Sequence, residues 1–174
     1  MKFQHEFIIK APIQMVVDFH KKSASMGDIT PPPIRVIFQC APEELAEGDE
    51  IEFTLWMGPV PVRWLARIEE ASPAGFTDRQ LSGPFREWVH RHTFIQMSEN
   101  RTKIVDQVQA RLDSHPFTGI SGMLMWLGMP ILFSYRAWKT RRLLENKWLD
   151  TGRVTLKANI DHISQERTEG ADLK

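Results

Sequence analysis

The feature that most constrains the fold is a pair of runs that alternate with period two. The first run covers residues 75–81, the second covers residues 86–94, and Ser-Gly-Pro-Phe separates them at 82–85. Alternation of this kind is typical of strands, and turn-forming residues between two such runs are typical of a hairpin. The sequence therefore predicts an antiparallel hairpin over residues 75–94.

One face of this hairpin has an unusual composition. Successive side chains of a strand point to opposite faces. The shared face therefore carries Phe76, Asp78, Gln80, Trp88, His90, His92 and Phe94. A plain core face is apolar throughout, and a plain solvent face lacks Phe and Trp. A mixed face suits the wall of a cavity, and a hydrogen-bonded core is the alternative.

The turn also predicts which residues are opposite one another. A reversal near residues 83–84 places Asp78 opposite His90 and Phe76 opposite His92, with a slip by two residues as the alternative register. A buried carboxylate needs a partner. We therefore expect Asp78 to hydrogen-bond His90 or His92 on the concave side of the sheet, with Gln80 and Asp106 close to that pair.

The other segments complete an α+β pattern. They are a strand at 3–9, a helix at 12–22, an extended connector at 23–33, strands at 34–40, 50–57, 62–70 and 101–113, and a helix at 130–149. Pairing across a turn at 98–101 places Asp106 near Phe94 or His92, so a second carboxylate joins the mixed face. A curved antiparallel sheet around one long helix is the simplest arrangement that buries these faces.

Composition sets the class of protein. With 174 residues we expect one domain over residues 1–149, followed by a loosely ordered polar tail at 150–174. Lys plus Arg and Asp plus Glu are both 22, so no basic excess supports nucleic-acid binding. The single cysteine, Cys40, excludes an internal disulfide and provides no metal-binding spacing. The first residues lack the apolar core of a signal peptide, so we expect a cytoplasmic protein.

The segment before the last helix is apolar and rich in methionine. Residues 116–135 form an uncharged stretch that is long enough for a membrane span, but its glycines and proline argue against one. We expect residues 119–129 to form a partly exposed, mobile lid. Transient contact of this lid with an anionic membrane surface is the alternative to closure over its own pocket. The cations that follow are interpreted as a solvated face: Arg136, Lys139, Arg141 and Arg142.

These residues resemble a known superfamily over about residues 3–146. The motifs that carry the likeness are Thr30-Pro31-Pro32, Trp64 with Ile68, Phe76-x-Asp78-x-Gln80, Gly83-Pro84-Phe85, Trp88-x-His90-x-His92-x-Phe94 and Asp106. The chain resembles the START-like, helix-grip (SRPBCC) superfamily, and within it a bacterial branch of uncharacterised ligand-binding proteins. The sequence departs from this pattern after Leu112.

The resemblance implies a fold and a class of ligand. The fold would be a curved antiparallel sheet of about seven strands that wraps around a long C-terminal helix and encloses a deep apolar cavity. Members of the wider superfamily carry lipids, sterols, quinones or polyketides, and some are cyclases or hydrolases. The branch itself implies no established substrate.

Three hypotheses follow for function. The first is binding or transport of a hydrophobic small molecule, such as a lipid, quinone, isoprenoid or polyketide-like compound. The second is a cyclase- or dehydratase-like enzyme that uses His90 or His92 with Asp78 as an acid–base pair. The third is a metal site formed by His90, His92 and Asp106, for which the signal is weak. We expect no cofactor, no metal and no catalytic residue; the sequence does not predict the oligomeric state.

Two sets of residues can be tested against the structure. The candidate ligand-binding residues are Asp78, Gln80, Trp88, His90, His92, Phe94, Asp106, Met125, Tyr135 and Trp138. The candidate core residues are Phe38, Phe53, Trp64, Phe76, Trp88, Phe94, Phe133 and Trp138.

Overall fold

The computed structural model describes residues 1–171 and has the α+β architecture that the sequence predicts. Its elements in chain order are β1 (Lys2–Ile9), α1 (Ile13–His20), α2 (Ser25–Asp28), β2 (Ile34–Cys40), β3 (Glu50–Met57), β4 (Val60–Ser72), β5 (Gly75–Ser82), β6 (Phe85–Ser98), β7 (Arg101–Leu112) and α3 (Pro116–Ala171).

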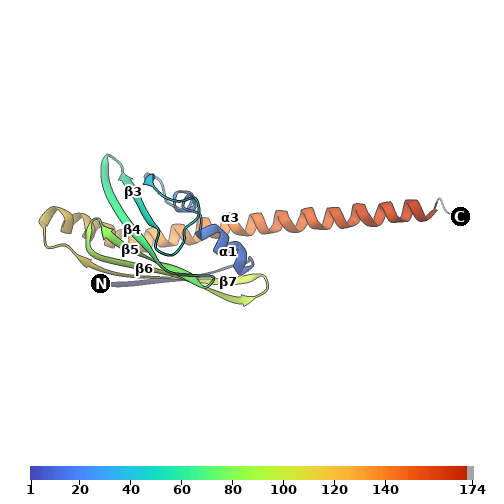
Figure 1. Cartoon of the computed structure of the whole chain (residues 1–174), viewed down its shortest axis with the longest axis horizontal. Coiled ribbons are helices and arrows are strands. Elements are labelled where there is room, and N and C mark those ends of the chain that lie inside the picture. Colours follow the sequence, from blue (N-terminus) through green and yellow to red (C-terminus); the bar gives the residue numbers. More distant parts are fainter. Residues whose placement is uncertain (172–174) are drawn as a thin grey trace.

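The strands form one antiparallel sheet of seven strands in the order β1-β7-β6-β5-β4-β3-β2. The sheet curves along the N-terminal part of α3, and the rest of α3 projects beyond it (Figure 1). The two edge strands, β1 and β2, are joined through α1 and α2. This is the sheet wrapped around a long C-terminal helix that the resemblance implies.

The register of the central hairpin is as predicted. Asp78 pairs with His90 and Phe76 with His92 across β5 and β6, and His92 pairs with Asp106 across β6 and β7. Gly75 permits the close approach of β5 to β6, because it has a φ of 139° and a Cβ atom there would lie 1.9 Å from the carbonyl oxygen of His92. Glycine alone adopts such a conformation without strain.

The core lies between the concave face of the sheet and α3. Five of the predicted core residues are buried there, namely Phe53, Trp64, Trp88, Phe94 and Phe133. Phe38 and Phe76 are partly buried and pack against the same core. The prediction for Trp138 was wrong, because this side chain is 49% exposed on the outer side of α3.

Two helices differ from the sequence prediction. Residues 25–28 form a one-turn helix within the predicted extended connector, and the Ser25 and Thr30 hydroxyls donate hydrogen bonds to the carbonyls of Lys22 and Met26. The long helix begins at Pro116 and includes Pro130, where the predicted helix began. Proline inside a helix removes one N–H donor but does not always end the helix.

The Met-rich segment is therefore the first part of α3, and its predicted mobility stays a prediction. The backbone of residues 150–171, predicted as a polar tail, continues α3. Whether that part is loosely held also stays a prediction.

The outer face of α3 is apolar and exposed. Leu124, Leu127 and Ile131 are 65%, 67% and 75% exposed. By length and composition, Thr118–Thr151 satisfies the criteria for a membrane-spanning helix, which core helices of soluble proteins also satisfy. Transient membrane contact and a cytoplasmic location both stay predictions.

Candidate functional site

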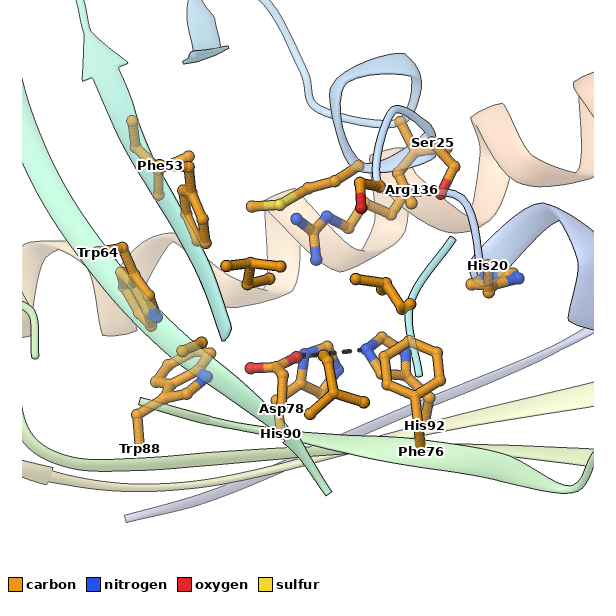
Figure 2. A pocket seen from close by; sticks show the side chains of 18 of the residues that line it. His20, Ser25, Phe53, Trp64, Phe76, Asp78, Trp88, His90, His92 and Arg136 are labelled. Carbon is orange, nitrogen blue, oxygen red and sulfur yellow. Dashed lines mark ion pairs between the residues drawn. The ribbon is translucent and has the colours of Figure 1, made fainter. Parts of the chain in front are cut away.

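A cavity lies between the concave face of the sheet and α3. Its volume is about 150 Å³. Its walls are mainly apolar and aromatic, and include Phe53, Trp64 and Trp88 (Figure 2). Ala66, Met125, Met129 and Phe133 also line it. Residues of α1, α2 and the chain next to them line the remaining side, among them His20, Ser25 and Met26. The cavity is thus bounded by both layers of the fold and by the segment that connects the edge strands.

A cluster of two carboxylates and two imidazoles lies at the sheet side of this cavity. Asp78 Oδ2 is 3.1 Å from His90 Nδ1 and 3.5 Å from His92 Nε2. Asp106 Oδ1 is 3.3 Å from His90 Nε2 and 2.9 Å from His92 Nδ1. Each carboxylate therefore contacts both rings, and the ring centroids are 3.9 Å apart. We call Asp78, His90, His92 and Asp106 the histidine–aspartate cluster.

The strand pattern explains this cluster. His90 and His92 are two residues apart on β6, so both side chains point to the concave face. Asp78 on β5 and Asp106 on β7 are their neighbours across the two ladders. The alternation of side chains along β6 thus places both histidines on the concave face. The two hairpin turns set the register that brings Asp78 and Asp106 next to them.

Burial and charge together set the protonation of the cluster. Burial alone would lower the pKa of His92, but the contacts with Asp106 and Asp78 outweigh it and raise this pKa to about 9. Burial alone would raise the pKa of each carboxyl group, but His90 and His92 hold both pKa values well below the usual range. At neutral pH, His92 is therefore a cation between two carboxylate anions.

A third histidine, His20 on α1, also lines the cavity. Burial lowers its pKa to about 4, and the positive charge on His92 adds to this effect. Its Nδ1 lies 2.8 Å from the carbonyl oxygen of Val16. Since the carbonyl can only accept, Nδ1 carries the proton of the neutral ring, and Nε2 keeps its lone pair. His20 is thus a neutral hydrogen-bond acceptor beside the cavity.

Arg136 reaches the cavity from the opposite layer. Figure 2 shows its guanidinium pointing from α3 toward the interior of the cavity, on the side facing Asp78. The Nε atom is enclosed and has no hydrogen-bond partner among residues 1–171. Burial lowers the pKa of Arg136, and the charges of Asp106 and Asp78 oppose this shift. The prediction that Arg136 belongs to a solvated face was therefore wrong.

The structure brings together about half of the candidate ligand-binding residues. Asp78, Trp88, His90, His92 and Met125 line the cavity. Asp106 lies beside the two imidazoles and completes the cluster. Their role in ligand binding stays a proposal.

Gln80 and Phe94 have other positions. The Gln80 side chain donates a 2.6 Å hydrogen bond to the carbonyl oxygen of Phe85, at the turn between β5 and β6. Phe94 is buried in a second core cluster with α1 and β7, where its ring contacts His20. Both residues point to the predicted face, but they lie beyond the two ends of the cavity lining on their strands.

Tyr135 and Trp138 are on the wrong side of α3 for a role in the cavity. The residues of α3 that line it are Met125, Met129, Leu132, Phe133 and Arg136. This spacing of three to four residues follows one face of a helix. The Trp138 ring instead lies beneath the exposed guanidinium of Arg142, 5.6 Å from it.

The ligand atoms of Asp78, His90 and His92 lie within 4.8 Å of one another, so these residues could hold a metal ion. The sequence had suggested Asp106 as the carboxylate in place of Asp78. A metal would need a deprotonated nitrogen from each ring. In the structure, however, both nitrogens of each ring lie within 3.5 Å of a carboxylate oxygen, so a metal ion would have to replace one of these contacts on each ring. This arrangement favours an internal ion-pair cluster over a metal site.

Comparisons with known proteins agree with this architecture. No protein-family model matches the sequence, and no curated protein matches it. Among solved structures, a protein from Thermus thermophilus has a TM-score of 0.63 at 16% identity, over 84% of this chain and 99% of that one. A START superfamily protein from Mycobacterium smegmatis has a TM-score of 0.56 at 7% identity, over 83% of this chain and 97% of that one. The fold is START-like.

An enzyme has the same START-like fold. The Zhui aromatase/cyclase from Streptomyces sp. R1128 has a TM-score of 0.59 at 16% identity, over 82% of this chain and 95% of that one. At these identities the likeness concerns the START-like fold alone.

Proposed function

We propose that this START-like chain binds a hydrophobic small molecule in the cavity between the sheet and α3. The observation that carries the proposal is the cavity itself, with aromatic and aliphatic walls and a few converging polar groups. Small-molecule sites in proteins commonly have this composition. Burial of the apolar part of a ligand would supply the affinity, and the polar groups would set its orientation.

The volume favours a compact ligand. Dry apolar cavities of roughly 150 Å³ hold a molecule the size of benzene. The cavity here has about that volume, 150 Å³. A single ring with a short substituent fits it, whereas a lipid or isoprenoid chain would extend beyond it. Of the ligand classes that the sequence suggests, quinone-like compounds are the best match to this volume.

A cyclase- or dehydratase-like enzyme is the second candidate. The observation that favours it is the protonated His92 beside Asp78 at the cavity wall, because such a group can donate a proton to a substrate oxygen. Both nitrogens of each ring, however, already face a carboxylate. Neither ring presents a lone pair to the cavity as a general base would, so we favour binding without turnover.

Filling the cavity tests the proposal. Ala66 is 1% exposed and lines the cavity, so Ala66→Leu would occupy the space that the ligand needs. We expect a one-ring hydrocarbon, cumene, to raise the Tm of the unmodified protein, since a ligand that binds only the folded state stabilises it. In Ala66→Leu this rise should be lost.

Ala71→Leu is the matched control. Ala71 is on the same strand, β4, but it is exposed and lies outside the cavity lining. This variant should respond to cumene as the unmodified protein does. An equal rise in Tm in Ala66→Leu would show that cumene binds elsewhere and would contradict the proposal.

A further inference from the structure

The guanidinium of Arg136 is a cation without a close counterion at an apolar cavity. Within residues 1–171, it forms no ion pair with either carboxylate of the histidine–aspartate cluster within 4.0 Å. Its identified side-chain contact is the face of Phe133, 5.5 Å from the guanidinium carbon. A buried N–H donor without a partner destabilises the folded state, and more so when the donor is charged. A ligand that brings an acceptor oxygen to this point would recover part of that cost.

The charges around the cavity indicate which kind of oxygen is acceptable. Asp78 and Asp106 are anions, while His92 and Arg136 are cations, so these four charges sum to zero. Lys22, which also lines the cavity, is exposed to solvent. A carboxylate ligand would add a further negative charge in a low-dielectric space, which is costly unless a proton is taken up with it. A neutral carbonyl oxygen accepts the same hydrogen bonds and adds no charge.

The other polar groups are less suited to this role. The imidazole nitrogens of His90 and His92 lie within 3.5 Å of carboxylate oxygens, and His92 Nδ1 is enclosed beside Asp106 although it forms no hydrogen bond there. Neutral His20 offers an acceptor instead of a donor. Arg136 is therefore the cationic donor that extends into the cavity, while the neutral indole N–H groups of Trp64 and Trp88 also line it. Arg136 also projects from α3, on the side of the cavity opposite the sheet (Figure 2). An oxygen bound to it would therefore fix one end of the ligand.

We propose that Arg136 determines specificity in this cavity by donating hydrogen bonds to the carbonyl oxygen of a neutral, one-ring ketone or quinone. This inference rests on the proposed binding function. Hydrogen bonds to charged groups contribute about 1.5–3 kcal/mol, so the carbonyl should increase affinity by roughly tenfold or more over a hydrocarbon of the same shape.

Three probes of similar shape test the proposal: cumene, acetophenone and benzoate. Their affinities can be measured by NMR on protein labelled at the methionine methyl groups, since Met26, Met125 and Met129 line the cavity. We expect acetophenone to bind about tenfold more tightly than cumene, and benzoate more weakly than acetophenone. In Arg136→Met the preference for acetophenone should be lost while cumene still binds.

Arg142→Met is the matched control, because Arg142 is an exposed guanidinium on the same helix. It should keep the preference. Should Arg136→Met fail to fold, the Nε–Hε resonance of Arg136 in the unmodified protein gives an independent test. A hydrogen bond to the carbonyl should shift this resonance further with acetophenone than with cumene, which acts on it through its ring current alone.

The outcomes separate the two proposals. If none of the three probes binds in the cavity, the proposed function fails. If cumene and acetophenone bind equally, or the preference survives in Arg136→Met, the function stands and the role of Arg136 is refuted. If benzoate binds more tightly than acetophenone, the ligand class is wrong.

Discussion

Replacing Trp88 by alanine is expected to lower the free energy of unfolding by about 3–5 kcal/mol, the usual cost of removing a large aromatic side chain from a core. Trp88 is 7% exposed. Its ring packs against Trp64 and Phe85 at centroid distances of 5.3 and 4.9 Å. The loss removes these contacts and enlarges the cavity, and the surrounding strands can collapse only in part. Denaturant unfolding followed by circular dichroism measures the change.

Trp138→Ala provides the control for this experiment. It removes the same side chain from the exposed face of α3, where Trp138 is 49% exposed. Substitutions at such sites usually change stability by less than about 0.5 kcal/mol. A loss below about 1 kcal/mol in Trp88→Ala, or equal losses in the two variants, would remove Trp88 from the core.

The stability of the protein should also reach a maximum near pH 6.5. His92 has its pKa raised to about 9 from 6.5, so its stabilising contribution is complete below pH 6.5 and is lost as the pH rises through 9. His20 has its pKa lowered to about 4, so it acts in the opposite direction. Its contribution is complete above pH 6.5 and is lost as the pH falls through 4. Stability thus falls on an alkaline limb, set by His92, and on an acidic limb, set by His20. Each limb changes the free energy of unfolding by on the order of 3 kcal/mol, since one unit of pKa shift corresponds to 1.36 kcal/mol.

The two limbs can be separated by substitution. His92→Gln should flatten the alkaline limb, and His20→Gln should flatten the limb between pH 6.5 and 4. Should either variant fold poorly, NMR titration of the unmodified protein gives the same information. His92 and His20 both titrating near 6.5, as free histidines do, would contradict the described electrostatics.

Much of the site could be predicted from the sequence because strand geometry is simple. A period of two assigns each side chain to one face, and the Ser-Gly-Pro-Phe turn fixes which residues are opposite. The pairing of Asp78 with His90, and of Phe76 with His92, followed from these two facts and is confirmed by the register. The turn at 98–101 predicted Asp106 near Phe94 or His92, and the register pairs it with His92.

The helix side of the site could not be predicted as well. Sequence spacing shows that Phe133, Ala137 and Leu144 share a face, and these residues are indeed buried. It does not show how far the apolar surface around that face is covered, which depends on the curvature of the sheet. For this reason the predictions that Trp138 lies in the core and that Arg136 lies on a solvated face were both wrong. Arg136 follows Phe133 by three residues, a spacing that could have indicated the same side.

The volume of the cavity could not be predicted from the sequence either. A face that mixes aromatic, carboxylate and imidazole groups indicates a cavity wall, but the space left between sheet and helix depends on how each rotamer packs. His20 illustrates the difficulty. It shares a buried face of α1 with Val16 and Val17, whereas its contact with the cavity depends on how α1 docks against β6.

The most direct test of cavity binding is to locate a bound aromatic probe by NMR. In protein labelled at the methionine methyl groups, cumene should give intermolecular NOEs to Met26, Met125 and Met129, which line the cavity. A separate groove between α1 and α3 contains Met15. NOEs to Met15 alone, or to none of the methionines at saturating cumene, would contradict binding in the cavity.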